Sequence, residues 1–137
     1  MSDRFQLRVL TPQKEVFSGV VSEVIAMGHE GEFGVLPGHY PYITSVRPGP
    51  LSFADGDDQR VFAVGHGFAQ VSAEKVSIVV SSCEAASELD LAAVKEALSA
   101  AEGRLVDASA GEREALDAEL DQAMALGRLL AVERLGE

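Results

Sequence analysis

The chain has 137 residues, of which 47% are hydrophobic, and its formal net charge is -11 at pH 7. This length supports one hydrophobic core with an appendage rather than two full-sized domains. The excess of carboxylates repels phosphate backbones and anionic headgroups, which argues against nucleic acid and direct lipid insertion. No segment approaches the roughly 20 apolar residues of a membrane-spanning helix. We therefore expect a cytosolic chain whose membrane association, if any, comes through a partner.

The residues up to Ala86 have the composition of a β domain. They contain all five prolines, every aromatic residue and every histidine, mixed with β-branched residues. Apolar and polar residues alternate over residues 5–9, and Thr11-Pro12 and Asp55-Gly56-Asp57-Asp58 are turn signals between apolar stretches. Their spacing predicts about ten short strands in an antiparallel β-sandwich or flattened barrel over residues 1–86.

Residues 87–137 are rich in Ala, Leu, Glu, Asp and Arg, a composition typical of helices. Apolar residues recur every three or four positions from Leu91 to Leu105, and again in a second series. The break between the series, at 107–111, predicts an antiparallel two-helix hairpin, which buries too little to stand alone and must dock on the sandwich or on a partner. The second series, which repeats the same spacing, is Leu116, Leu120, Ala123, Gly127 and Leu130.

The sequence shows no recognisable catalytic or metal-binding constellation. Gly65-His66-Gly67 lacks the glycines and the following helix of a phosphate-binding loop. The three histidines lie apart in turns without the spacing of zinc ligands, and Cys83 is expected to be a buried core thiol. A small enzyme and a ligand-binding sandwich remain as alternatives; the first lacks a nucleophile or base, and the second lacks an aromatic platform, since the chain has no Trp.

The glycine-dense segment 28–41 is the densest local signal. It carries two carboxylates, Glu30 and Glu32, in a turn, and then a rigid Pro37-Gly38 corner that presents His39. These features suit an exposed recognition edge. The alternative is that the glycines merely permit tight turns between strands, and spacing by itself favours neither.

Three motifs follow one another near the start of the chain. They are Leu7-Arg8-Val9-Leu10-Thr11-Pro12, Val16-Phe17-Ser18-Gly19 and Glu30-Gly31-Glu32-Phe33-Gly34-Val35-Leu36-Pro37-Gly38-His39-Tyr40-Pro41. The segment 65–71 and the Ala-rich hairpin continue the pattern. In this order and spacing the motifs resemble the signature of the epsilon subunit of bacterial F-type ATP synthases. His66 is a local departure, because many relatives carry glycine there.

The resemblance implies an N-terminal β-sandwich, residues 1–86, that binds the γ subunit and the c ring, and a regulatory helical hairpin, residues 87–137. It implies a non-catalytic rotor subunit of the central stalk, without a cofactor or metal, that couples γ to the c ring during proton-driven ATP synthesis. The hairpin is then a candidate regulator of ATP hydrolysis through contacts with the α and β subunits. The expected location is the cytoplasmic face of the bacterial inner membrane, peripherally, within the complex.

Site residues also follow from the resemblance. Glu30, Gly31 and Glu32 match the turn that faces the polar loops of the c ring in relatives. Leu89 and Asp90 match the start of an ATP-binding motif of some relatives, but Ala93 stands where that motif has arginine, so we expect weak ATP binding or none. The positions expected to face γ are Thr11, His39 and Thr44.

Overall fold

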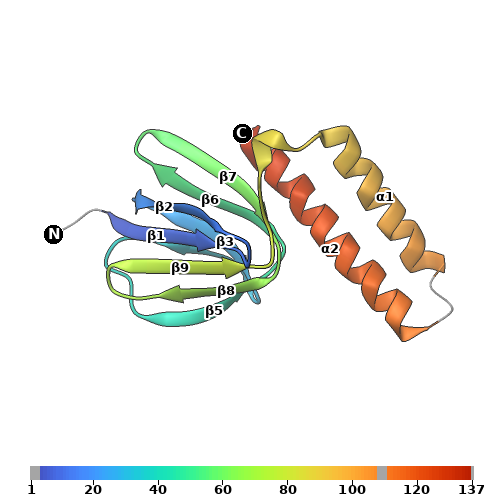
Figure 1. Cartoon of the computed structure of the whole chain (residues 1–137), viewed down its shortest axis with the longest axis horizontal. Helices are drawn as coiled ribbons and strands as arrows, with labels where there is room; N and C mark the ends of the chain where they lie inside the picture. The colour runs from blue at the N-terminus through green and yellow to red at the C-terminus, as the bar shows by residue number, and fades with distance from the viewer. Residues whose placement is uncertain (1–3, 108–110, 137) are drawn as a thin grey trace.

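The computed structural model describes residues 4–107 and 111–136, and it consists of a flattened β-barrel followed by two helices (Figure 1). The predicted fold, about ten short strands and then a helical hairpin, is confirmed. The strands are β1 (Phe5–Leu10), β2 (Glu15–Val21), β3 (Val24–Gly28), β4 (Gly31–Val35), β5 (Tyr42–Val46), β6 (Gly49–Asp55), β7 (Asp58–Val64), β8 (Gly67–Val71), β9 (Lys75–Val80) and β10 (Cys83–Ala85). A 3-10 turn, η1 (Ala86–Glu88), leads into α1 (Leu91–Asp107) and α2 (Glu112–Leu135).

The strands form one sheet in the order β10-β7-β6-β3-β5-β8-β9-β1-β2, and β4 pairs with β3 beside this path. Neighbours are antiparallel except β1 and β9, which run parallel from Gln6 beside Lys75 to Leu10 beside Val79. The sequence predicted antiparallel pairing throughout. Local alternation defines a strand but not its partner, and β1 and β9 are far apart in the chain, so this pairing depends on how the sheet closes.

The core follows the period-two alternation of the strands. In β1, Phe5, Leu7 and Val9 are buried while the residues between them are half-buried, and β9 repeats this pattern with Val76, Ile78 and Val80. β6 and β7 differ, because consecutive residues from Gly49 to Phe53 and from Val61 to Val64 are all buried. A strand is buried on both faces only when a second layer covers it.

That second layer is α2. Figure 1 shows α2 against the strands and α1 on its far side, away from them. Val61 and Ala63 of β7 pack with Ala86 and with Ala131 of α2 in a small cluster separate from the barrel core. At Gly127 the backbones themselves approach, since a Cβ there would lie 2.7 Å from the amide nitrogen of Gly49. The hairpin is therefore docked on the sandwich.

The residues buried in α2 have smaller side chains than the leucines of the predicted apolar series. In α2 they are Ala118, Ala125, Gly127 and Ala131, whereas Leu116 is 60% exposed and Leu120 44% exposed. The predicted series is thus buried only in part: Gly127 lies at the close contact with β6 and the leucines lie at its flanks, because helices that approach this closely accommodate small side chains at the contact. Within the described residues no helix is long and apolar enough to cross a membrane.

We predict that Gly127→Ala loosens α2 and that Gly103→Ala, the matched control, does not. Both substitutions gain about 1 kcal/mol of helix propensity. Only residue 127 meets backbone atoms, while a Cβ at Gly103 has nothing within 4 Å. The clash should cost about 1–3 kcal/mol. Hydrogen exchange of α2 amides measures the difference, and equal protection in the two variants would contradict the close contact.

Candidate interaction surfaces

The acidic turn between β3 and β4 is built by two glycines. Gly28 and Gly31 are register partners, which leaves His29 and Glu30 as the connection. Gly31 has a φ of 121°, a backbone conformation that favours glycine over residues with a side chain. The predicted turn is therefore present, and its geometry requires Gly31.

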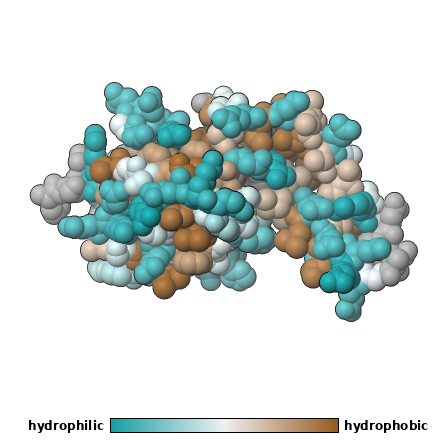
Figure 2. Space-filling view, viewed as in Figure 1, coloured by the Kyte–Doolittle hydropathy of each residue, from teal (hydrophilic) through white to brown (hydrophobic). Residues whose placement is uncertain are grey.

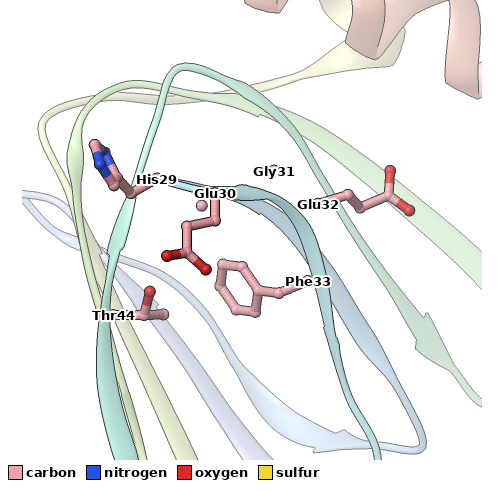
Figure 3. A pocket seen from close by; sticks show the side chains of 7 residues that line it. His29, Glu30, Gly31, Glu32, Phe33 and Thr44 are labelled. Carbon is pink, nitrogen blue, oxygen red and sulfur yellow. The ribbon is translucent and has the colours of Figure 1, made fainter.

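An open hollow of about 520 Å³ lies between this turn and β5. Figure 3 shows the Glu30 carboxylate and the Phe33 ring pointing toward Thr44 across the hollow, with His29 at its rim. A carboxylate, an aromatic ring and a hydroxyl around an open space suit a basic side chain. Thr44, predicted from the resemblance to face γ, thus lies with the acidic turn, a juxtaposition that the sequence did not indicate.

Glu32 points away from Glu30, toward the helices (Figure 3). Arg134 of α2 donates a hydrogen bond from Nη2 to Glu32 Oε2 at 2.8 Å. The Arg134 side chain is 28% exposed and the Glu32 side chain 49% exposed, so solvent screens the pair only in part. The two carboxylates that the sequence treated as equivalent have different surroundings, and nothing in the spacing of Glu32 indicated an arginine 102 positions away.

The outer face of β5, β8, β9 and β1 carries apolar residues at positions that alternation directs away from the core. Ile43 is 71% exposed and Phe68 47% exposed. Phe68 is the register partner of Val79, which in turn pairs with Leu10, so an apolar row crosses three strands. Figure 2 shows hydrophobic patches on this side of the barrel. An uncovered apolar face of this kind marks an interaction surface.

Tyr40, 88% exposed, stands beside His39 in the loop before β5. The His39 ring lies edge-on to Phe5, with the ring centroids 5.2 Å apart, and both of its nitrogens are buried without a hydrogen-bond partner among the described residues. Thr11 follows the opposite end of β1, where its backbone N–H donates to the carbonyl of Lys14 at 2.9 Å. Thr11, His39 and Thr44 are therefore spread over the barrel and do not form one cluster. The apolar row was missed by the sequence analysis, although the alternation contained its signal.

The residues of the partial ATP motif have structural roles. Asp90 Oδ1 accepts a hydrogen bond from the Ala92 N–H at 3.0 Å, which satisfies a free donor at the start of α1. Leu89 is half-buried against the cluster that includes Ala131. Ala93, in the place of the motif's arginine, is exposed.

A second hollow, of about 350 Å³, lies between α1 and α2. It contains two guanidinium groups, and both are already paired. Arg104 pairs with Asp121 across the hairpin, and Arg128 donates from Nε to Glu84 Oε1 of β10 at 2.8 Å. A phosphate group entering here would compete with a carboxylate that is already bound at each arginine.

Cys83 is partly buried against the barrel core, less deeply than predicted. Burial raises its pKa to about 12, so the thiol stays protonated at neutral pH and is a poor nucleophile. In the ranges that the structure describes, no group of three or more His, Cys, Asp or Glu residues is arranged to hold a metal.

Comparison with known proteins agrees with this architecture. Residues 4–86 match the family model for the β-sandwich domain of the ATP synthase delta/epsilon chain. ATP synthase epsilon chain 2 of Syntrophotalea carbinolica is 37% identical over 114 residues, 83% of each chain. The ATP synthase epsilon chain of Geotalea uraniireducens is 40% identical over 105 residues, 77% of this chain and 76% of the relative.

Two solved structures share the fold. A chain in the cryo-EM structure of Euglena gracilis mitochondrial ATP synthase, which contains OSCP, F1 and the c-ring, superimposes with a TM-score of 0.84 at 21% identity, over 100% of this chain and 84% of that one. A chain in the central stalk/c-ring structure of Tetrahymena thermophila mitochondrial ATP synthase gives 0.65 at 14% identity, over 93% and 96%.

The structure and its surfaces define a small β-sandwich protein with a docked helical hairpin, whose distinctive features are an acidic turn and an uncovered apolar face. The chain belongs to the delta/epsilon chain family of the ATP synthase, and the resemblance to bacterial-type epsilon subunits is confirmed.

Proposed function

We propose that the chain is a non-catalytic central-stalk subunit that joins γ to the c ring, so that torque passes through its sandwich during proton-driven ATP synthesis. The observation that carries this proposal is the pairing of an uncovered apolar face with an acidic turn on one rigid barrel. The outer row of Leu10, Phe68 and Val79 supplies apolar surface for γ. The hollow at Glu30 supplies a carboxylate for basic residues of c-ring loops.

Thr11, His39 and Thr44 stay in the proposal as γ-facing positions. The His39 ring packs against Phe5 with both nitrogens buried, so its part in the contact is through the loop that also carries the exposed Tyr40. Thr44, which lines the hollow with Glu30, is placed to contact either partner. Assembly through γ and the c ring holds the chain peripherally on the cytoplasmic face of the membrane.

We expect charge reversal in the turn, Glu30→Lys with Glu32→Lys, to weaken coupling between proton flow and synthesis. Replacing attraction by repulsion at two exposed sites should cost about 1–2 kcal/mol of binding to the c ring. Glu74→Lys is the control, because Glu74 is exposed in the turn between β8 and β9, at the end of the barrel opposite the acidic turn. Proton pumping and synthesis in reconstituted vesicles are the measurements. Normal coupling in an assembled complex with the double reversal would refute the role of the turn.

The domain division is also part of the proposal: residues 1–86 form the binding domain and 87–137 a regulatory hairpin. Among the described residues the barrel core includes none from α1 or α2, and α2 rests on a separate small cluster with Val61, Ala63 and Ala86 and on Gly49 of β6. Removing the hairpin therefore exposes a limited apolar area.

We predict that a chain lacking residues 88–137 keeps its β-structure and still binds γ. Circular dichroism measures the first and co-purification with γ measures the second. Loss of the β spectrum would show that α2 is required for the sandwich to fold. A folded but non-binding fragment would instead place part of the γ contact on the hairpin.

The hairpin is proposed to bind ATP weakly or not at all and to inhibit hydrolysis little. Residues 88–137 contain twelve acidic and five basic side chains, a net -7 that opposes a polyanionic nucleotide. The two arginines of the interhelical hollow are paired, and Ala93 offers no cation. Contacts of the hairpin with acidic segments of the catalytic subunits lack the basic surface that they need, because α2 carries only Arg113, Arg128 and Arg134.

Isothermal titration with magnesium-ATP should show no saturable binding at micromolar concentration, and ATPase activity of the complex should change little when the hairpin is deleted. The physical reason is the same in both cases, a shortage of unpaired cations. Micromolar binding would contradict the first expectation. Strong activation on truncation would contradict the second.

A further inference from the structure

Two ion pairs tie α2 to the sandwich among the described residues, and both lie in the C-terminal part of the helix. Arg128 holds Glu84, next to the hinge from sandwich to hairpin, and Arg134 holds Glu32, on the strand that follows the acidic turn. The second pair alone connects the last turn of α2 with the β3–β4 hairpin. A change at the turn therefore has a direct electrostatic route to the end of the helix.

Arg134 depends on Glu32 for its ion pair with the sandwich. A small hollow of about 220 Å³ beside α2 is lined by Met27, Pro50 and Leu130 and by the charged side chains of Glu32, Glu133 and Arg134. Glu32 is the carboxylate to which the Arg134 guanidinium group is bonded, while Glu133 lines the same hollow as its neighbour in the sequence. If a cation from outside binds Glu32, Arg134 loses its partner on the sandwich and keeps only a neighbour on its own helix, which contributes nothing to docking.

We propose that Glu32 is a shared ligand, for which Arg134 competes with a basic partner at the β3–β4 turn. Occupation of the turn then loosens the end of α2, and docking of α2 weakens binding at the turn by the same factor. Glu30 faces the other way and binds without this competition. The identity of the basic partner as the c ring rests on the proposed function, but the coupling of turn and helix does not.

Hydrogen exchange on the full chain tests the coupling without a partner. Glu32→Gln removes the charge that a bound cation would neutralise, and Glu30→Gln is its control with the same change in net charge. We expect exchange in the C-terminal turns of α2 to rise about two- to fivefold in Glu32→Gln, the range of a partly exposed ion pair. Exchange there should be unchanged in Glu30→Gln. Adding Arg134→Gln to Glu32→Gln should produce no further increase in exchange. A further increase in the double variant, or no increase in Glu32→Gln itself, would overturn the coupling.

Binding to a purified rotor of γ and c ring tests the competition. Arg134→Gln releases Glu32 and should bind about two- to fivefold more tightly than Arg113→Gln, a control on the exposed start of α2 with the same net charge. The advantage should vanish in the double variant with Glu32→Gln. Equal affinities of the two arginine variants would overturn the competition while leaving the proposed function intact. If the unmodified chain does not bind the rotor, the proposed function fails, and the exchange experiment still decides the coupling.

Discussion

The close contact between α2 and the β6–β7 layer is the constraint on which much of the remaining structure depends. At Gly127 the helix backbone lies so near Gly49 that no side chain fits between them. One turn further along the helix, Ala131 packs against Val61 and Ala63 of β7. Small residues reduce the distance between the two surfaces, and this short distance brings charged ends of longer side chains within reach of the sandwich. Without it, Arg128 and Arg134 would have no partners on the strands.

Docking also explains the unusual burial of β6 and β7. Most strands of the barrel show one buried and one accessible face, but these two carry apolar residues on both. The face under α2 is covered within the chain, whereas the outer face of β5, β8, β9 and β1 is equally regular and stays uncovered. One apolar surface is therefore used for the intramolecular contact, and the other is left for a partner. This division gives the sandwich two distinct sides.

The acidic turn lies between the surface that α2 covers and the hollow beside β5. Glu30 faces the hollow that contains Phe33 and Thr44, and Glu32 faces the helix that contains Arg134. Glu30 belongs to the turn and Glu32 to β4, and Gly31 between them has a φ of 121°, outside the regular strand conformation, so the two carboxylates acquire different surroundings. One is accessible to a partner, and the other already has a counter-ion. The turn is thus part of the hairpin contact and of the proposed intermolecular surface.

The sequence by itself determined the local features of this protein. Period-two alternation identified the strands, a three-and-four spacing identified the helices, and the motifs around Glu30–Gly34 identified the family, because each of these signals lies within a short stretch of chain. Tertiary structure decided the rest: the parallel pairing of β1 with β9, the burial of Ala125 while Leu116 and Leu120 stay exposed, and the pairing of Glu32 with Arg134. These features join residues distant in the chain, and they depend on how closely two surfaces approach, which local periodicity does not encode.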